Sequence, residues 1–390
     1  MGWELLFLLL PVAALSGWLA GRRGREPAGA RSREPLSSEY FKGLNYLLNE
    51  QPDKAIEVFV RMVEVDGDTI ETHFALGNLF RRRGEVERAI RIHQNLIARP
   101  TLSRPHRLQA LYELGCDYMR AGVLDRAENL FAEVGEEPVW AERALSQLLD
   151  IYQQEKDWTN AIATARRLRE TVGPEAGRVI AQYQCELAEE ARRKKDLGKA
   201  ARLIKQALQE DPDCVRASLM EAELLLAQDN PKAGIRALKR IERQDPGFLP
   251  EAIEPLRRAY TALGRPLELM HYLRQLLKEH GGITVLNALV ELMRQQQGDR
   301  DAALFLTDYL KKAPSVRGME RLIELKAAHS ADSSIRDELE ILRGLAVQLA
   351  ETKPAYKCEN CGFEGRTLHW QCPSCKQWAR IKHIQGVEAD

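Results

Sequence analysis

The stretch L-G-N-L-F-R-R-R-G-E-V-E-R-A-I-R-I-H-Q, residues 76–94, carries a pattern that recurs along the chain. Its Gly77 and Ala89 follow Gly43 and Ala55 at the same offset of 34 residues. A repeat of this length corresponds to one pair of packed helices. Small residues allow two helix backbones to approach closely, and a glycine between the helices can take the turn conformation. The spacing therefore predicts a stack of helix pairs.

Further copies of the pattern follow, and they weaken toward the carboxyl terminus. The sequence L-G-C-D-Y at residues 114–118 begins a third copy, with Gly122, Ala127 and Phe131 after it. Aromatic, small and proline residues mark the later copies: Tyr152 and Ala161; Ala188, Ala200 and Pro212; Ala222, Ala233, Gly234 and Pro246; Tyr260 and Gly264; Ala302 and Pro314. The period and the residue types are those of the tetratricopeptide repeat, so we expect an all-α superhelix of about eight or nine units over residues 37–350.

Two expectations concern the end of this array. Pro266 lies just after the turn at Gly264, and Leu269 stands near a small-residue position. Both departures predict looser, bent packing from about residue 248 onward. Residues 321–349 are expected to form a further amphipathic helical region that caps the array.

The composition suits helices and gives no positive sign of catalysis. Lysine plus arginine and aspartate plus glutamate both number 57, so the formal net charge is zero, which argues against a general polyanion binder. The sequence contains no Walker loop, no G-x-S-x-G motif and no dinucleotide fingerprint. The basic stretches Arg81–Gly84 and Ala191–Asp196 lie at predicted helix ends, where cations oppose the helix dipole and are expected to be solvated. We therefore predict a protein that is not an enzyme and has no nucleic-acid partner.

The most specific chemical signature is Y-K-C-E-N-C-G-F-E-G-R-T-L-H-W-Q-C-P-S-C-K-Q-W, residues 356–378. Two Cys-x-x-Cys pairs, ten residues apart, supply four candidate metal ligands: Cys358, Cys361, Cys372 and Cys375. Each pair forms a turn that directs two thiolates to one point, so two pairs make a tetrahedral sulfur site. The chemistry favours one structural metal, Zn or Fe with Zn preferred, in a small rubredoxin-like or zinc-ribbon-like four-cysteine module over residues 351–390. A redox-active single iron and a nucleic-acid-binding zinc ribbon are the alternatives.

The residues around these pairs favour a structural module that docks on the array. Gly362 and Pro373 favour turns that aim backbone N–H groups at the sulfurs. His369 and His383 are alternative ligands, although four cysteines already complete a tetrahedron. The module has more aromatic surface than it needs internally, and the surplus is expected to pack against the repeats: Tyr356, Phe363, Trp370 and Trp378. The remaining cysteines are isolated and are expected to be buried small apolar residues in a reducing compartment: Cys116, Cys185 and Cys214.

The amino terminus contains an uncharged apolar run, Leu5–Ala20, with Trp3 and Trp18 near its ends. Tryptophan favours the membrane interface, and the run is close to the length that a bilayer requires. A cleaved signal peptide is the alternative, but no basic residue precedes the run and several arginines follow it. We predict an uncleaved transmembrane anchor over residues 1–21 with its amino terminus outside, then a basic cytoplasmic linker over residues 22–36.

Together these segments resemble one known family. The anchor sequence E-L-L-F-L-L-L-P-V-A-A followed by G-R-R, the repeat at residues 76–94 and the terminal cysteine knuckle are similar to the lipopolysaccharide assembly protein B family of Gram-negative bacteria. The resemblance covers essentially the full length. The knuckle departs from rubredoxin in two ways, because only ten residues separate its pairs and Lys376 stands where rubredoxin usually has glycine.

The resemblance implies a single-pass protein of the cell inner membrane with a periplasmic amino terminus and most of the chain on the cytoplasmic side. Members of this family couple the membrane AAA+ protease FtsH to LpxC, the deacetylase that commits precursor to lipid A. They also connect with lipopolysaccharide assembly and export proteins. The implied function is an adaptor that restrains lipopolysaccharide synthesis by promoting proteolysis of the deacetylase. A passive envelope-assembly scaffold is the alternative, and a homodimer is compatible with the same sequence.

Overall fold

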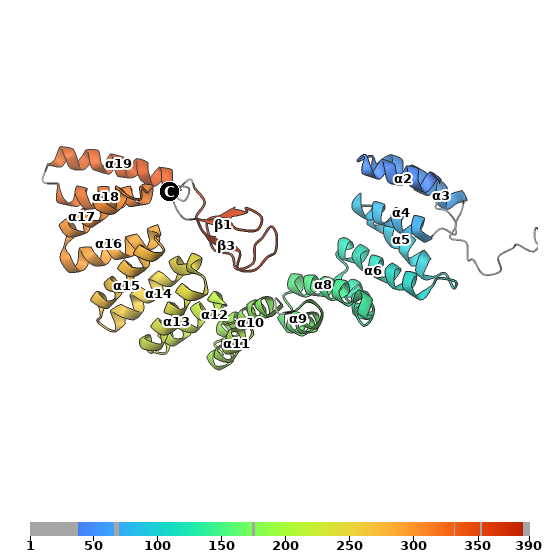
Figure 1. The fold of residues 1–390 in the computed structure, drawn as a ribbon, viewed down its shortest axis with the longest axis horizontal. Coiled ribbons are helices and arrows are strands. Elements are labelled where there is room, and N and C mark those ends of the chain that lie inside the picture. Colours follow the sequence, from blue (N-terminus) through green and yellow to red (C-terminus); the bar gives the residue numbers. More distant parts are fainter. Residues whose placement is uncertain (1–37, 66–69, 174–175, 331, 352, 385–390) are drawn as a thin grey trace, which may run out of the picture. The chain divides into compact units, whose positions relative to one another are not determined.

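The computed structural model of the chain describes residues 38–65, 70–173, 176–330, 332–351 and 353–384 (Figure 1). The predicted anchor at residues 1–21 and the predicted linker at residues 22–36 lie outside these ranges. Among the residues described, no helix combines the length and the apolar character that crossing a membrane requires. The fold is otherwise helical, with a small sheet near the carboxyl terminus.

The chain divides into two compact units, which meet in the sequence at Gly122 and Val123. The described part of the first unit contains five helices: α2 (Ser38–Leu48), α3 (Pro52–Val65), α4 (Ile70–Arg82), α5 (Val86–Ile97) and α6 (Arg104–Ala121). The second unit continues with α7 (Leu124–Val134), α8 (Pro138–Glu155), α9 (Trp158–Val172), α10 (Ala176–Arg193), α11 (Leu197–Glu210), α12 (Val215–Ala227), α13 (Pro231–Gln244), η1 (Pro246–Phe248), α14 (Leu249–Ala262), α15 (Pro266–Glu279), α16 (Ile283–Gln297), α17 (Asp299–Leu310), α18 (Val316–His329) and α19 (Ser333–Glu351). Within each unit, helices that are neighbours in the sequence pack on one another.

Close helix approach in the first unit depends on the small residues of the repeat. A Cβ atom added to Gly43 would lie 2.6 Å from the ring of Phe59, so only glycine fits between these helices. The equivalent Gly77 faces the imidazole of His93, whose Nε2 would lie 2.5 Å from such a Cβ atom. Gly84 ends the turn between α4 and α5 with a φ of +83°, in the left-handed region that favours glycine. The structure confirms the roles predicted for the small residues and the turn glycine.

The second unit contains the largest apolar core among the described residues, and it extends from Val215 to Leu325. The predicted loosening after residue 248 is therefore wrong. Leu269, Leu273 and Leu276 of α15 are buried, because large apolar side chains fill the interface where the earlier repeats use small ones. Pro266 begins α15 at a position where a helix tolerates proline.

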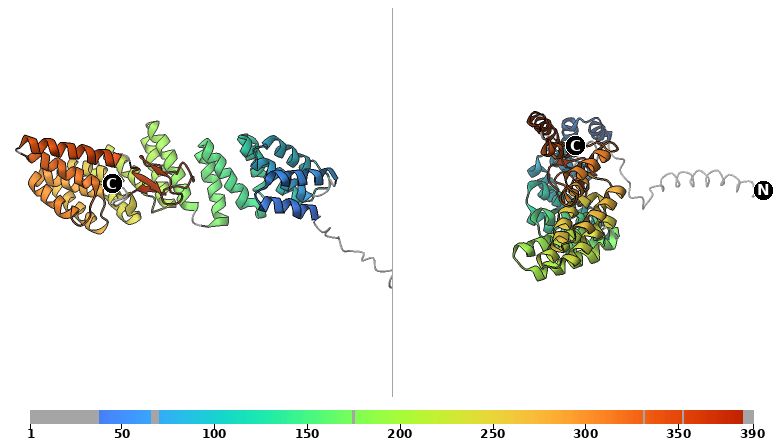
Figure 2. Two further views of the ribbon diagram at one scale, coloured as in Figure 1. Left: turned by 90° about the horizontal axis from the view of Figure 1, so that it is seen from above. Right: turned by 90° about the vertical axis from the view of Figure 1, so that its left-hand side faces the viewer.

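The terminal module contains three short strands: β1 (Tyr356–Cys358), β2 (Glu364–Gly365) and β3 (Ile381–His383). They form an antiparallel sheet in the order β2-β1-β3, with Tyr356 opposite Gly365 on one side and His383 on the other. In Figure 2 this sheet lies apart from α18 and α19, although α19 directly precedes it in the sequence. The module instead lies against earlier helices of the second unit, which position it.

Candidate metal centre

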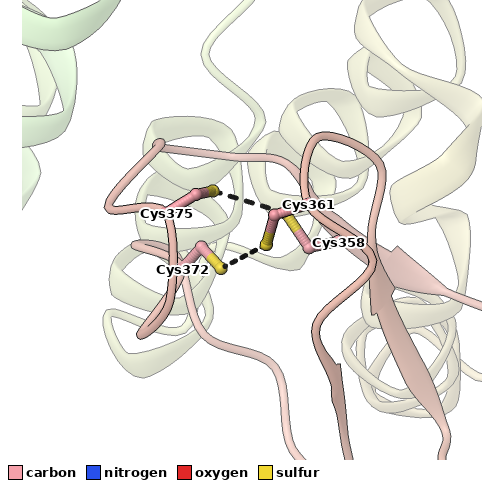
Figure 3. Close-up of side chains that lie close together, drawn as sticks. All are labelled: Cys358, Cys361, Cys372 and Cys375. Atoms are coloured by element: carbon pink, nitrogen blue, oxygen red, sulfur yellow. Dashed lines mark hydrogen bonds between the residues drawn. The ribbon is translucent and has the colours of Figure 1, made fainter. Parts of the chain in front are cut away.

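Four cysteine side chains converge from two turns of the terminal module (Figure 3). The Sγ atom of Cys358 lies 3.8 Å from that of Cys375, and the Sγ atom of Cys361 lies 3.7 Å from that of Cys372. All four sulfurs lie within 4.8 Å of one another. A tetrahedral site with metal–sulfur bonds of about 2.3 Å places its sulfurs about 3.8 Å apart. The observed distances therefore fit a single four-coordinate metal ion.

The first turn is held by two backbone hydrogen bonds. The N–H of Cys358 donates to the carbonyl of Phe363 at 2.8 Å, and the N–H of Gly362 donates to the carbonyl of Cys358 at 2.9 Å. Gly362 has a φ of +74°, so the turn needs a residue that accepts the left-handed region. This geometry confirms that Gly362 acts as the predicted turn former.

The second turn repeats the first one bond for bond. The N–H of Cys372 donates to the carbonyl of Gln377 at 2.9 Å, and the N–H of Lys376 donates to the carbonyl of Cys372 at 3.0 Å. Lys376 has a φ of +60° and occupies the position that Gly362 has in the first turn. The departure from the rubredoxin pattern therefore keeps the turn conformation and places a non-glycine residue in a strained region.

Backbone N–H groups favour the thiolate form at one cysteine of each turn. The N–H of Phe363 lowers the pKa of Cys361, and the N–H of Gln377 lowers the pKa of Cys375 to about 6. Burial has the opposite effect on Cys372 and raises its pKa to about 11. A metal binds cysteine as thiolate, so N–H groups aimed at two of the sulfurs suit metal binding.

The two histidines that the sequence offered as alternative ligands lie outside the sulfur cluster. Nε2 of His369 lies 3.3 Å from the hydroxyl oxygen of Thr367, and the ring of His383 packs edge-on against Tyr356. Among the described residues, the cluster that includes the cysteines contains no other metal-binding group. The donor set is therefore four sulfurs, which is typical of a structural zinc site or of a single iron.

One edge of the module packs on η1 and α14. The ring of Trp370 stacks on Phe248 with 5.4 Å between ring centroids and 21° between ring planes. The hydroxyl of Tyr356 donates a hydrogen bond of 2.7 Å to the carboxylate of Glu251. A stacked ring and a phenol with an ionic acceptor fix both the position and the rotation of this edge.

A second edge of the module packs on α8, α9 and α10. Trp378 contacts Trp158 and Tyr183 edge-on, with ring centroids 6.1 and 5.9 Å apart. The side-chain oxygen of Gln153 accepts hydrogen bonds from Trp378 Nε1 at 3.1 Å and from Gln371 Nε2 at 2.8 Å. The predicted docking of surplus aromatic residues on the repeats is confirmed for these edges. The residues that receive them lie about 100 to 220 positions earlier in the chain, and no local sequence pattern identified them.

Comparison with protein-family models separates the same two parts of the chain. Residues 356–382 match the rubredoxin metal binding domain. Residues 72–107 and 191–254 match the tetratricopeptide repeat. These matches agree with a helical repeat array that ends in a cysteine knuckle.

Curated relatives match almost the whole chain. Lipopolysaccharide assembly protein B of Escherichia coli strain K12 is 38% identical over 386 residues, which cover 99% of this chain and 99% of the relative. This chain belongs to the lipopolysaccharide assembly protein B family. The protein of the same name from Haemophilus influenzae is 34% identical over 394 residues, with 99% of each chain covered. A solved tetratricopeptide repeat protein with an unusual peptide-binding site, YrrB, is 18% identical, covers 49% of this chain and 94% of its own, and has a TM-score of 0.33.

In this member of the lipopolysaccharide assembly protein B family, Arg81 is not a solvated cation at a helix end. Its guanidinium donates to Glu113 at 2.7 Å and to Asp117 at 2.9 Å, and it thereby joins α4 to α6. Nδ1 of His93 lies 2.5 Å from the other carboxylate oxygen of Asp117, and both of these side chains are fully buried. The expectation for Arg81–Gly84 is therefore wrong at its first residue. The polar cluster is structural, and its histidine is not grouped with further metal-binding side chains in the described part of the chain.

The cysteines outside the knuckle also differ in part from expectation. Cys185 of α10 and Cys214, the residue before α12, are buried as predicted, but they are not isolated. Their thiols share a hydrogen bond, which together with burial raises the pKa of Cys185. The same hydrogen bond lowers the pKa of Cys214. Cys116 is only partly buried, and desolvation raises its pKa to about 11. The high thiol pKa of Cys116 and Cys185 suits packing and disfavours reactivity.

Proposed function

We propose that the protein is a non-enzymatic adaptor at the inner membrane that restrains lipopolysaccharide synthesis. The observation that carries this proposal is the relationship, along 99% of the chain, to proteins named for lipopolysaccharide assembly. The helical repeat architecture supports it, because stacked helix pairs present extended surfaces on which other proteins bind. The partners in this proposal are an FtsH-type protease, an LpxC-type deacetylase and lipopolysaccharide assembly or export proteins.

The proposed mechanism is a gain in effective concentration. The apolar run at residues 5–20 anchors the chain with its amino terminus in the periplasm and places the repeats on the cytoplasmic side. A repeat array that binds the deacetylase beside a membrane-bound protease makes their encounter intramolecular. No chemical step by the adaptor is required, because the protease supplies it.

The proposed role of the knuckle is to hold one structural metal ion. Its ligands are Cys358, Cys361, Cys372 and Cys375, and zinc is favoured because it forms closed tetrahedral sites of four sulfurs without redox chemistry. A bound ion fixes the two turns against each other and supplies folding free energy to a module with a very small core of its own. The module can then present Trp370 and Trp378 to the repeats at fixed positions.

The regulatory role is tested by depleting the protein in cells and following the half-life of the deacetylase. The expected result is a lengthened half-life of the deacetylase. Expression of the wild-type chain should return the half-life to normal, but not when the protease is inactivated. An unchanged half-life contradicts the adaptor role. Capture of assembly proteins without the protease would then favour a passive envelope-assembly scaffold.

The metal is tested on protein purified without oxygen and with all four cysteines intact. One equivalent of zinc by elemental analysis, without a reversible iron transition in the visible spectrum, is the expected result. One equivalent of iron that cycles between two oxidation states would support a redox metalloprotein instead.

A further inference from the structure

The last helix, α19, carries a row of exposed large apolar side chains. Ile335, Leu342 and Leu349 recur at intervals of seven residues, and Ile341 and Leu345 widen the row. These five side chains are 50–66% exposed. The end of a repeat array ordinarily has a polar outer face, because solvent covers it. An apolar row at this position indicates a surface that another molecule covers.

This row is separate from the face by which α19 folds against its neighbour. α19 packs on α18, and Ala346 is its buried residue, with Leu339, Arg343 and Val347 partly buried. At 100° per residue, the buried and partly buried positions lie on one side of the helix. The exposed row begins beside them and covers the neighbouring part of the helix surface. Association through the row therefore leaves the packing of α18 on α19 intact.

The charges on α19 argue against a membrane surface as the cover. The charged side chains described on α19 include two basic and three acidic ones: Arg336, Arg343, Asp337, Glu338 and Glu340. A helix that lies on an anionic bilayer is instead rich in lysine and arginine on its polar face. Another apolar helix is the better complement.

Part of the apolar pattern of α19 is symmetric about Leu342, whereas the counterpart of Ile341 is the charged Arg343. Ile335 and Leu349 stand seven residues to either side of it, and Leu339 and Leu345 stand three residues to either side. In an antiparallel pair that crosses at Leu342, Ile335 meets the partner subunit's Leu349, and Leu342 meets its own counterpart. A surface with this property is complementary to itself, which is the requirement of a two-fold interface.

The same arrangement avoids repulsion between charged side chains. Arg343 stands opposite the partner subunit's Ile341, and Arg336 stands opposite the partner subunit's Gln348. No two like charges then face each other directly, which matters because such pairs cost binding free energy.

We propose that α19 is a self-association surface on which a second copy of this chain packs in the antiparallel direction about a two-fold axis at Leu342. Ile335, Leu342 and Leu349 from each copy form the centre of this interface, and charged side chains lie at its rim. The proposal is independent of the adaptor role, because it concerns the state of the purified chain.

The first test is sedimentation of the full chain in a density-matched detergent across micromolar concentrations. The wild type is expected to form a dimer, and Leu342→Glu, which places two carboxylates at the axis, is expected to weaken the dimer at least tenfold. Leu267→Glu is the matched control, because Leu267 is 65% exposed on α15, away from α19. It should change the dimer constant less than twofold. A monomeric wild type, or a dimer that Leu342→Glu leaves intact, overturns the proposal.

The second test is disulfide crosslinking of cysteine variants under copper-phenanthroline oxidation, with the unsubstituted chain as background. Leu342→Cys is expected to crosslink to itself. Ile335→Cys and Leu349→Cys should crosslink when mixed and remain uncrosslinked when each is alone. Self-crosslinking of either single variant indicates a parallel pair and contradicts the antiparallel interface.

Discussion

Two interfaces of this protein use opposite chemistry to join separate elements of the fold. The polar interface, formed by Arg81, His93, Glu113 and Asp117, joins α4, α5 and α6 in the first unit. It is built of polar side chains that hydrogen-bond to one another, although the buried Nε2 of His93 has no partner among the described residues, and it belongs wholly to the repeats. Its strength depends on the completeness of the cluster, because a buried charge without a partner is costly.

The aromatic interface joins the terminal module to the helices of the second unit. It consists of Trp370 on Phe248, and of Trp378 on Trp158 and Tyr183. Stacked and edge-on rings tolerate the loss of single contacts better than a buried ion cluster does. However, one side of this interface exists only while the cysteine turns hold their shape. The comparison predicts that metal loss opens the aromatic interface and leaves the polar interface unchanged.

The largest expected effect is that of Cys372→Ser. A serine hydroxyl replaces a buried thiolate ligand, and structural zinc contributes on the order of 10 kcal/mol to folding in small zinc modules. We expect metal content to fall to near zero, the indole fluorescence of Trp370 and Trp378 to shift toward that of exposed tryptophan, and function in cells to be lost. Amide hydrogen exchange in α4 and α6 should remain as in the wild type.

Cys116→Ser is the control for Cys372→Ser, because this cysteine lies outside the knuckle. It should retain one equivalent of metal and the native fluorescence. Full metal content in Cys372→Ser would show that three sulfurs suffice and would remove the link between the metal and the aromatic interface.

The next largest effect is expected from Asp117→Ala. The substitution leaves the buried His93 without its acceptor and removes one of the two carboxylates that Arg81 engages. Removing one partner from a buried ion pair costs about 3–5 kcal/mol, and because Arg81 keeps its contact with Glu113 the expected loss is about 3 kcal/mol. Hydrogen exchange in α4, α5 and α6 should accelerate, while metal content stays at one equivalent.

Glu87→Ala is the control for the polar interface, because the pair of Glu87 with Arg91 is exposed and long at 3.7 Å. Such pairs contribute about 0–1 kcal/mol. If Asp117→Ala and Glu87→Ala have equal effects on amide hydrogen exchange, the buried cluster stabilises the first unit no more than an exposed ion pair does.

The repeat period was sufficient to predict the helix pairs but not the polar interface. Gly43 and Phe59 follow the expected combination of a small residue and an aromatic one. At the corresponding place beside Gly77 the chain has His93, and a scattered histidine gives no signal of burial. Its acceptor Asp117 lies in the next helix, 24 residues away. The hydrophobic period identifies which helix faces are buried, but it does not predict which polar side chains on neighbouring helices form a pair.

For the knuckle, the sequence predicted the local structure but not the long-range contacts. Its two turns follow from spacing within 18 residues, because each Cys-x-x-Cys pair fixes its own geometry. The surplus of aromatic residues predicted that the module docks. This surplus did not identify the docking site on the repeats, since Gln153 and Phe248 meet the module only after the intervening helices have stacked. The prediction of loose packing after residue 248 fails for a related reason. A departure from the repeat pattern does not imply weak packing, because leucines fill that core.

A smaller effect is expected from Trp370→Ala, which removes the stacked ring from Phe248 but keeps the metal. Large-to-small substitution of a core aromatic residue costs about 3–5 kcal/mol, and the partial exposure of Trp370 reduces the expected loss to about 2 kcal/mol. In a unit of this size, that loss lowers the thermal midpoint by about 4–8 °C. Metal content should remain at one equivalent. Loss of the metal in this variant would mean that docking forms the cysteine site, which reverses the order of dependence argued above.

The smallest effect is expected at a second ionic contact of the repeats, where Glu210 of α11 accepts hydrogen bonds from Arg166 at 3.0 Å and Arg169 at 2.7 Å. Burial alone would raise the pKa of Glu210, but these two hydrogen bonds outweigh it and lower the pKa. The ionised carboxylate therefore stabilises the fold at pH values above its unfolded pKa of about 4.3, and this contribution is lost as the pH falls through the lower folded value. Glu210→Gln should cost about 1 kcal/mol or less at pH 7, because the arginines are partly exposed. The difference in unfolding free energy between the wild type and this variant should shrink below pH 4. A difference of the same size at pH 3 and pH 7 would mean that the charge of Glu210 does not contribute to this contact. The polar contacts of the repeats would then differ from one another in chemistry as much as they differ from the aromatic interface.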